Sequence, residues 1–347
     1  MKDHSVLEQD MKHMLATPAD WSSLKNATVL ITGATGLIGS MLCRTLSILS
    51  IQEEWNLKII ANARDEKKAR EMLCDVEKNG NIDFLIQDVS TPLKLDGNVD
   101  YIIHAACPTK SNYFIAQPVE TLQSIVMGTA NVLEFARQKN CKSVLYLSSM
   151  EVYGEVTEEN LLTEEDVGYL NPLSLRSSYP EGKRCAEAFC IAYAKEYGVP
   201  AKVIRLAQTF GPGIPREDNR VFAQFLRSAL AGEDIVMFTN GGSKHMYIDT
   251  MDAVSASLMV LLAGEAGEVY NAANEENYFT IREMAELVLA EFGNGKNSLK
   301  IDTTKNTGQY PKEHKLKLDI SKLKALGWKP QYDLKQMYLR LKREMED

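Results

Sequence analysis

The stretch ATVLITGATGLIG, residues 27–39, predicts a buried strand that leads directly into a glycine-rich turn and a helix. Residues 27–32 form an unbroken apolar, β-rich run, which is typical of a parallel strand buried on both faces. Glycine permits a tight bend and a close approach of the backbone to a pyrophosphate, while the helix N-terminus faces the phosphates. The spacing is G-x-x-G-x-x-G, and the alternative is a glycine-rich turn without a ligand. We interpret the turn as a dinucleotide site formed by Gly33, Thr35, Gly36, Leu37, Ile38 and Gly39.

Short apolar runs and helix-period stretches alternate along the first 206 residues. The runs lie at residues 57–61, 82–86, 99–104, 144–148 and 202–206, and the helical stretches include residues 38–49, 65–77, 118–139 and 181–197. This alternation predicts an α/β fold, in which helices cover both faces of a doubly wound, Rossmann-type parallel sheet.

After residue 206 the alternation ends, and the chain becomes less regular and more polar. A loop with Gly211 and Pro212 comes first, and helices are predicted at residues 280–292 and after Pro330. We therefore expect an N-terminal extension at 1–26, an NAD-binding Rossmann domain at 27–206, and a smaller, mainly substrate-binding α/β region at 207–347.

The residues after the second predicted strand bear on the choice between NAD and NADP. An acidic residue at this place binds the ribose hydroxyl of NAD, whereas an arginine accommodates the 2′-phosphate of NADP. Arg64 and Asp65 are adjacent here, so the two residues point to different cofactors. We expect NAD as the cofactor, and NADP stays open at this site.

Composition argues against several classes of function. The net charge of -8 and the lack of a basic cluster argue against a nucleic-acid partner. Six cysteines without a C-x-x-C pair and only five histidines argue against a metal site, so none is predicted, and favour reduced thiols in the cytoplasm. No apolar stretch approaches the length of a membrane-spanning helix. We expect a soluble cytoplasmic protein.

Tyr179 and Lys183 lie four residues apart and follow Ser149 by 30 residues. An ammonium one helical turn away favours the phenolate, and Pro180 at a first helical position would place Tyr179 at a helix start, where the dipole lowers its pKa further. Such a tyrosine can take a hydroxyl proton while hydride leaves the same carbon. These residues therefore predict a site that oxidises an alcohol.

The spacing of this pair is not specific by itself. Tyr338 and Lys342 repeat it in a charged C-terminal segment that indicates a solvated helix. The surrounding motifs give the first pair its weight.

Residues 27–335 resemble the extended short-chain dehydrogenase/reductase family, specifically its nucleotide-sugar epimerases, dehydratases and decarboxylases. The shared residues include the glycine turn, Asp88-Val89, His104-Ala105-Ala106, SSMEVYG at 148–154, Tyr179 with Lys183, Arg205 with the TFGP stretch at 209–212, and LGWKP at 326–330. The resemblance implies that Asp88, Val89, His104, Ala105, Ala106, Tyr179 and Lys183 bind NAD. It also implies a homodimer through the helices at 118–139 and 181–197.

Three stretches resemble the UDP-glucuronate decarboxylase branch in particular, namely residues 107–122, 171–184 and 218–225. By this resemblance Ser149 orients the substrate hydroxyl, Tyr179 is the base at C4, and Lys183 holds the nicotinamide ribose. Glu151 matches a glutamate near C5 of the sugar. Arg176 and Arg220 match basic positions near the sugar acid and the diphosphate. The resemblance thus implies transient C4 oxidation of a nucleotide-diphosphate sugar with tightly bound NAD.

Four residues depart from the pattern of this branch. Met150 stands where dehydratases have aspartate and decarboxylases usually serine, which argues against 4,6-dehydration, because a thioether cannot protonate a leaving hydroxyl. Ile125 and Gln208 replace asparagines, and His245, beside Lys244, replaces an arginine used on the diphosphate. We expect Gln208, Lys244 and His245 to contact substrate together with Arg176 and Arg220. Epimerisation and NADP-dependent ketone reduction remain alternatives to decarboxylation.

Overall fold

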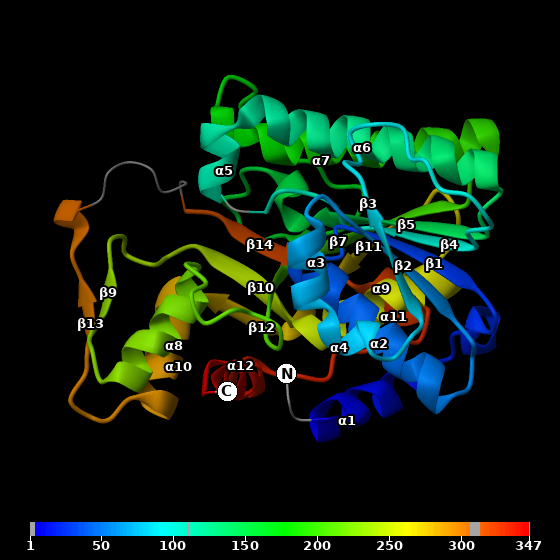
Figure 1. Cartoon of the computed structure of the whole chain (residues 1–347). Coiled ribbons are helices and arrows are strands. Elements are labelled where there is room, and N and C mark those ends of the chain that lie inside the picture. The colour runs from blue at the N-terminus through cyan, green and yellow to red at the C-terminus, as the bar shows by residue number, and fades with distance from the viewer. Residues whose placement is uncertain (1–3, 110, 306–312, 347) are drawn as a thin grey trace.

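The computed structural model describes residues 4–109, 111–305 and 313–346; residues 1–3, 110, 306–312 and 347 lie outside the described ranges. Its centre is a seven-stranded parallel sheet with the order β11-β7-β5-β4-β1-β2-β3 (Figure 1). The strands are β1 (Thr28–Thr32), β2 (Lys58–Ala63), β3 (Ile82–Ile86), β4 (Tyr101–His104), β5 (Ser143–Ser149), β7 (Ala201–Leu206) and β11 (Val269–Ala272). The strand order reverses at β1, between β2 and β4, and such a switch point is where open parallel sheets bind ligands.

Helices cover both faces of this sheet, which confirms the predicted Rossmann-type fold (Figure 1). On one face α6 (Pro118–Lys139) packs along α7 (Ser178–Tyr197), and on the other lie α2 (Leu37–Gln52) and α9 (Thr250–Ala263). Side chains of β1 alternate between two hydrophobic cores, with Val29 and Ile31 in one and Leu30 in the other. The apolar runs are continuous because both faces of each strand are buried.

The helix predicted at residues 65–77 is interrupted. It forms α3 (Glu66–Met72) and α4 (Cys74–Glu77), and Leu73 lies between them with φ -109° and ψ 23°. The side chain of Leu73 is fully buried. Tertiary packing therefore overrides the helical pattern at this position.

A second sheet lies beside the carboxyl ends of the parallel strands. Its order is β12-β10-β14-β6, and β8 also pairs with β10. The strands are β6 (Leu161–Leu162), β8 (Gln208–Phe210), β10 (Lys244–Asp249), β12 (Asn274–Thr280) and β14 (Lys315–Leu318), and β9 (Ile235–Met237) pairs with β13 (Leu299–Ile301). Around them lie α8 (Val221–Ala231), α10 (Ile281–Phe292), α11 (Ser321–Ala325) and α12 (Leu334–Glu346). Residue 206 does not separate the two regions cleanly. β11 belongs to the first sheet and α9 packs on it, although both follow residue 206, whereas β6 precedes this residue and belongs to the second sheet.

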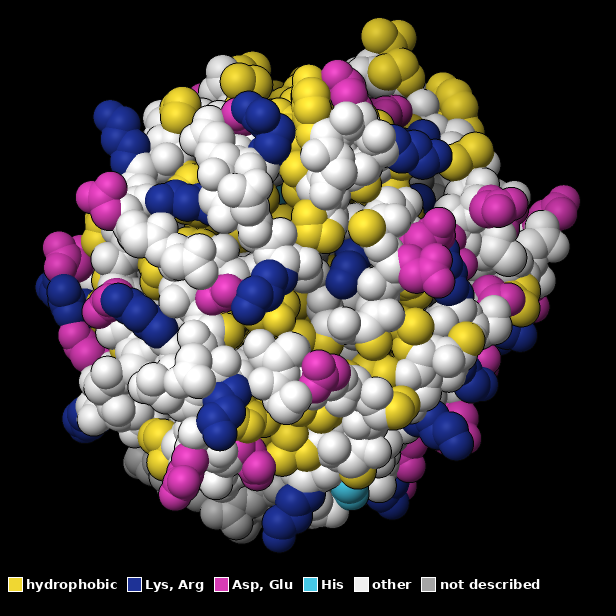
Figure 2. All heavy atoms as spheres, turned by 90° about the vertical axis from the view of Figure 1, so that its right-hand side faces the viewer, with side chains coloured by type: hydrophobic (Ala, Val, Ile, Leu, Met, Phe, Trp, Pro, Cys, Tyr) yellow, Lys and Arg dark blue, Asp and Glu magenta, His cyan; other side chains and the backbone are white. Residues whose placement is uncertain are grey.

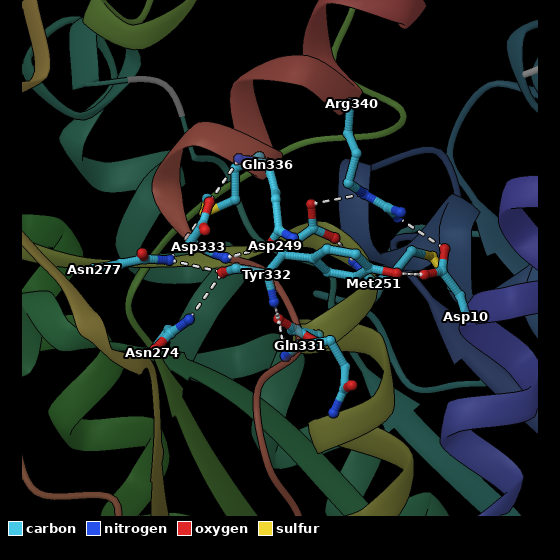
Figure 3. A network of polar contacts seen from close by, with 12 residues as sticks. Asp10, Asp249, Met251, Asn274, Asn277, Gln331, Tyr332, Asp333, Gln336 and Arg340 are labelled. Atoms are coloured by element: carbon cyan, nitrogen blue, oxygen red, sulfur yellow. Dashed lines mark hydrogen bonds and ion pairs between the residues drawn. The ribbon is translucent and has the colours of Figure 1, made fainter. Parts of the chain in front are cut away.

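The N-terminal extension forms α1 (His4–Leu15) and the short turn η1 (Trp21–Leu24), and it is tied to the C-terminal helix by buried charges. Figure 3 shows Arg340 of α12 between two carboxylates, with Nη2 2.8 Å from Asp10 and Nε 3.1 Å from Asp249. The Tyr332 hydroxyl also donates to Asp10. Asp252 accepts backbone N–H groups of residues 331 and 332. The extension is therefore part of the folded core.

Replacing Arg340 with methionine should lower the free energy of unfolding by about 3–5 kcal/mol near neutral pH, because two buried carboxylates lose their cation. Burial raises the pKa of Asp249 to about 6, against the opposing charge of Arg340. A raised folded-state pKa contributes stability at low pH that is lost as the pH rises through that pKa. The deficit of the variant should therefore be smaller at about pH 5 than at about pH 8, as measured by urea unfolding.

The matched control for this variant is Lys342→Met. Lys342 is paired with Glu346 on the exposed side of the same helix, and such surface pairs contribute about 0–1 kcal/mol. Equal losses for the two variants would contradict the role given to the buried cation.

The sequence indicated a solvated helix around Tyr338, and this prediction is wrong for Tyr338 itself. Its side chain is fully buried in the core of the second region, with its ring centroid 5.1 Å from that of Phe210. The charged residues of α12 lie on the other side of an amphipathic helix, and they masked the apolar face in the sequence. Lys342 remains on the surface.

Figure 2 shows the face towards which the carboxyl ends of α6 and α7 run. Lysine and arginine side chains are interspersed with aspartate and glutamate, so charge on this face is distributed rather than gathered by sign. Among the helices of the described ranges, none has the length and apolarity needed to cross a membrane. The same ranges contain no group of three or more His, Cys, Asp or Glu side chains placed to hold a metal ion.

Candidate active site

The glycine turn after β1 leaves space for backbone only. Gly33 has φ +67°, and a Cβ at this position would lie 2.7 Å from the backbone of Ala106 at the end of β4. A Cβ on Gly39 would lie 2.2 Å from the carbonyl oxygen of Gly33. The helix α2 begins directly after Gly36. Because glycine has no side chain to cap the helix, the first backbone N–H groups face the crevice at the switch point. This cradle fits the pyrophosphate of a dinucleotide.

Gly33→Ala should abolish retention of the dinucleotide through purification, because the new methyl group meets β4 and displaces the turn. The released nucleotide is measured after denaturation, per mole of chain. Gly80→Ala is the matched control, because Gly80 has φ +75° but nothing within 4 Å of the position that its Cβ would take. Both variants carry the same backbone strain, so loss of the nucleotide in both would contradict the steric explanation.

The residues predicted to select the cofactor lie on the surface after β2. The Asp65 carboxylate caps α3, accepting the backbone N–H of Lys68 at 3.0 Å. Arg64 is 69% exposed, and its Nη1 is 3.8 Å from Asp88. Asp88 in turn accepts the backbone N–H of Ser90 at 2.8 Å. The contacts of these side chains with a ribose stay predictions.

His104 at the end of β4 is buried and lies between two hydroxyl groups, and its contact with the cofactor stays a prediction. Its Nδ1 is 2.7 Å from the Thr32 hydroxyl, its Nε2 is 3.2 Å from the Thr129 hydroxyl, and burial lowers its pKa to about 3. The Thr32 hydroxyl also accepts the backbone N–H of Ala106 at 3.2 Å. The neutral imidazole thus joins the ends of β1 and β4 directly beneath the glycine turn.

The structure brings Ser149, Tyr179 and Lys183 together at the carboxyl end of β5. Ser149 ends the strand and accepts the backbone N–H of Glu151 at 3.2 Å, and its hydroxyl lies near enough to Tyr179, in the first turn of α7, to act on the pKa of that phenol. Lys183 lies one turn further along the helix and donates from Nζ to the carbonyl oxygen of Leu147 at 2.6 Å. The Tyr179 ring stacks on Phe114 of α5 (Ser111–Ala116), with centroids 4.3 Å apart.

The expected position of Tyr179 in its helix needs a small correction. The helix begins at Ser178, after a 3-10 turn η3 (Leu175–Ser177), so Pro180 is the third helical residue rather than the first. The helix is therefore started by the preceding 3-10 turn and not by the proline. Tyr179 still lies in the first turn, where a helix favours negative charge.

The sequence predicted a lowered pKa for Tyr179, and this prediction is wrong for the protein without bound cofactor. Burial raises this pKa well above its usual value, and the nearby Cys107 and Glu151 raise it further, against the opposing effect of the Ser149 hydroxyl. The Lys183 ammonium is 5.8 Å from the phenol ring and donates to a carbonyl instead. The sequence pattern contained the cation but not the burial.

Two further predicted residues meet beside this trio. Glu151 lies in the 3-10 turn η2 (Met150–Tyr153), and its Oε1 is 3.7 Å from Nη2 of Arg176 in η3. Both side chains are about one-third exposed, at 30% and 31%. Met150, in contrast, is buried and packs into the hydrophobic core shared with α9. The turn therefore directs its glutamate and its methionine to different environments.

The other predicted substrate residues have contacts of their own. Arg220 precedes α8 and pairs with Asp218 at 2.8 Å. Lys244 pairs with Glu159 at 3.0 Å. Gln208 pairs in the sheet with Tyr247 of β10. No interaction among the described residues joins these three to the trio, and their contacts with substrate stay predictions.

His245 is largely buried and packs against a second histidine, and its contact with substrate stays a prediction. Its side chain is 8% exposed, its Nε2 lies 2.8 Å from Nε2 of His314, and burial lowers its pKa to about 3, with His314 as the second cause. Ile125 is also buried, and its Cδ1 lies 3.2 Å from the Cβ that Gly182 would carry. Both departures from the branch pattern thus fill the interior of the protein.

A buried polar network behind the trio was not anticipated from the sequence. Glu187 accepts Nη2 of Arg205 at 2.7 Å and the hydroxyl of Ser148 at 2.5 Å. Arg205 also donates to the Tyr153 hydroxyl at 3.0 Å, which donates to Asn271 at 2.7 Å. An acidic residue four positions after Lys183, on the same helix face, was the signal available. The network fixes β5, η2 and α7 relative to one another.

The comparisons with known proteins agree with this geometry. UDP-glucuronic acid decarboxylase 6 of Arabidopsis thaliana is 32% identical over 312 residues, which cover 90% of this chain and 86% of that protein. UDP-glucuronic acid decarboxylase 1 of Xenopus tropicalis is 30% identical over 89% of this chain and 69% of its own length.

Solved structures show the same fold at lower identity. A dTDP-glucose 4,6-dehydratase from Streptomyces venezuelae, with NAD bound, has a TM-score of 0.75 and 23% identity, over 92% of this chain and 98% of that one. A UDP-glucuronic acid 4-epimerase from Bacillus cereus, also with NAD, has a TM-score of 0.75 and 19% identity, over 92% and 99%.

The NAD-dependent epimerase/dehydratase family matches residues 29–273, from β1 to the end of β11, a span that includes the glycine turn and the trio. NAD is the cofactor of this family, and the cradle at Gly33 and Gly39 fits it. The chain belongs to the NAD-dependent epimerase/dehydratase family and is an enzyme of the extended short-chain dehydrogenase/reductase type.

Proposed function

We propose that this protein decarboxylates a UDP-hexuronate through transient oxidation at C4, with NAD that stays bound through the cycle. The observation that carries the proposal is the Glu151–Arg176 pair, 3.7 Å apart, beside Ser149 and Tyr179. An oxidising trio alone suits every member of the family. A carboxylate and a guanidinium next to it suit a substrate that itself carries a carboxylate and must be reprotonated at the neighbouring carbon. The similarity to UDP-glucuronic acid decarboxylases over nine-tenths of the chain supports the same assignment.

The residues divide the chemistry as follows. Bound NAD supplies a hydride acceptor and, when oxidised, a positive charge that favours the Tyr179 phenolate. Tyr179 takes the proton of the C4 hydroxyl, which Ser149 orients, while the C4–H bond breaks and hydride leaves. Lys183 holds the nicotinamide ribose, because the carbonyl oxygen of Leu147 uses only one of its three donors.

Oxidation makes the sugar a β-keto acid. The bond from C5 to the carboxylate then breaks, carbon dioxide leaves, and the electron pair forms an enolate with the C4 oxygen. Arg176 recognises the carboxylate before this step. The Glu151 carboxylate passes a proton from a water molecule to C5, and the hydroxide that this leaves combines with the released carbon dioxide as bicarbonate. Tyr179 would then give its proton back to the C4 oxygen as hydride is returned to C4, which would restore both the residue and the bound cofactor.

Retention of the cofactor separates this proposal from its alternative of another class, an NADP-dependent ketone reductase. Denaturation of the purified protein should release about one NAD per chain, and turnover of UDP-glucuronate should need no added cofactor. An empty site, combined with oxidation of NADPH by small ketones, would overturn the proposal. Epimerisation at C4 uses the same trio and would give a product of unchanged mass.

We also propose that two copies associate through α6 and α7. These helices pack side by side on one face of the sheet (Figure 1). α6 exposes Val119, Leu122 and Met127, with exposed fractions of 58%, 39% and 50%. Exposed apolar side chains on one helix favour an interface. Light scattering should give the mass of a dimer, and Met127→Glu should shift it towards the monomer. Cytoplasmic location stays a prediction.

A further inference from the structure

Lys183 is a buried ammonium without a counter-ion. Its side chain is 3% exposed, and within the ranges described no carboxylate forms an ion pair with it. Burying an ammonium without a partner is costly, so other groups must stabilise it in its position. The carbonyl oxygen of Leu147, at 2.6 Å, accepts a hydrogen bond from it, and the Cys107 thiol lies nearby. A single carbonyl oxygen and a thiol, which is a weak acceptor, leave most of the charge uncompensated.

A further group is the ring of Tyr146, which precedes Leu147 in β5. The Lys183 Nζ lies 4.6 Å from the centroid of this ring, closer than its 5.8 Å to the ring of Tyr179. The face of an aromatic ring is electronegative and attracts a cation, most strongly when both are removed from water. Tyr146 is 2% exposed, so this contact is desolvated.

The hydroxyl of Tyr146 does not account for the presence of a tyrosine at this position. It is buried and forms no hydrogen bond to any other residue in the described ranges. A buried hydroxyl without a partner costs stability, so the part of the side chain with a function is the ring. The ring is also held in place, with its centroid 5.5 Å from that of the buried His104.

We propose that Tyr146 is a positioning residue, whose ring holds the Lys183 ammonium at the height where its remaining donors meet the cofactor ribose. The inference rests on the proposed role of Lys183 in binding NAD. Tyr146 touches neither the sugar nor its reacting carbon; it acts through Lys183 alone. Its removal should therefore weaken retention of NAD before any substrate is present.

Ring electronics can be changed here without changing the shape of the side chain. Tyr146→Phe should retain NAD within about twofold of the wild type, because only an unpartnered hydroxyl is lost. Phenylalanines that carry increasing numbers of ring fluorines, introduced at position 146, should lower the affinity for NAD stepwise, to a loss of about tenfold for the most fluorinated ring. The measurement is the dissociation constant for NAD by calorimetry on protein stripped of nucleotide. The fluorinated side chains match phenylalanine in shape, so the variants should fold.

Tyr338 is the matched control site, because it is fully buried, its hydroxyl has no hydrogen bond within the described ranges, and no described cation lies over its ring. The same fluorinated series there should leave NAD affinity unchanged. If the affinity for NAD did not change with ring fluorination at position 146, the inference would be overturned. Lys183→Met separates this from a failure of the proposed function: if that variant binds NAD as tightly as the wild type, the role of Lys183 is wrong. If it loses NAD while the fluorinated series does not, only the role of Tyr146 is wrong.

Discussion

Tyr179→Phe is expected to lower kcat for UDP-glucuronate by about 10²–10⁴-fold, because a positioned general base contributes that much to the rate. The phenylalanine ring keeps the stack on Phe114, whose centroid lies 4.3 Å away, so packing should change little. Bound NAD should also remain, since Lys183 is untouched. The measurement is single-turnover formation of reduced nicotinamide, read by its absorbance after substrate is mixed with the holoenzyme. No reduced cofactor should accumulate.

Tyr338→Phe is the matched control for this variant. It removes a hydroxyl from the other Tyr-x-x-x-Lys pair, in a separate hydrophobic core. Its turnover should equal that of the wild type. Retained activity of Tyr179→Phe would mean that another group, such as the Ser149 hydroxyl, takes the proton from C4.

Glu151→Gln is expected to slow product formation by about 10²-fold while leaving the first oxidation fast, because Glu151 acts only after carbon dioxide has left. Reduced nicotinamide should therefore accumulate on the enzyme after mixing with substrate, the opposite of the result for Tyr179→Phe. The amide keeps the shape of the side chain and one acceptor for Arg176. Stopped-flow absorbance follows the cofactor, and quenched samples follow the nucleotide sugar by mass spectrometry.

Glu158→Gln provides the comparison, because Glu158 is an exposed residue of the loop that follows the same 3-10 turn. It should leave both phases unchanged. If Glu151→Gln instead slowed reduction of the cofactor and product formation equally, Glu151 would act in substrate binding or in the first oxidation.

Local patterns in the sequence were sufficient for six of the seven strands of the central sheet, whereas β11 lies beyond residue 206, where the alternation was expected to have ended, and was missed. Each predicted run became a strand within one or two residues, because strands buried on both faces must be continuously apolar. The glycine spacing was also local, since a Cβ on Gly39 would meet the carbonyl oxygen of Gly33, but the close approach of Gly33 to Ala106 after β4 is a contact across more than 70 residues. The grouping of Ser149, Tyr179 and Lys183 followed from motifs with fixed places on β5 and α7.

Long-range contacts could not be read in the same way. The partner of His245 lies 69 residues away in the sequence, and Arg340 contacts Asp10 across 330 residues. The residues next to His245 or Arg340 in the sequence therefore do not indicate either pair. The pKa of Tyr179 was misjudged for the same reason, because burial and the neighbouring Cys107 depend on how β4 and α5 pack over α7. Side-chain direction is a further limit, as the different environments of Met150 and Glu151 show.

The fate of the substrate carboxylate tests the proposed reaction most directly. The holoenzyme is incubated with UDP-glucuronate labelled with carbon-13 at the carboxylate, without added cofactor, and the nucleotide sugar and the gas phase are analysed by mass spectrometry. The account predicts labelled carbon dioxide and a UDP-sugar that is lighter by that amount, with NAD on the enzyme unchanged in quantity. A UDP-sugar that keeps its label and its mass, at a new retention time, would contradict it and identify the enzyme as an epimerase.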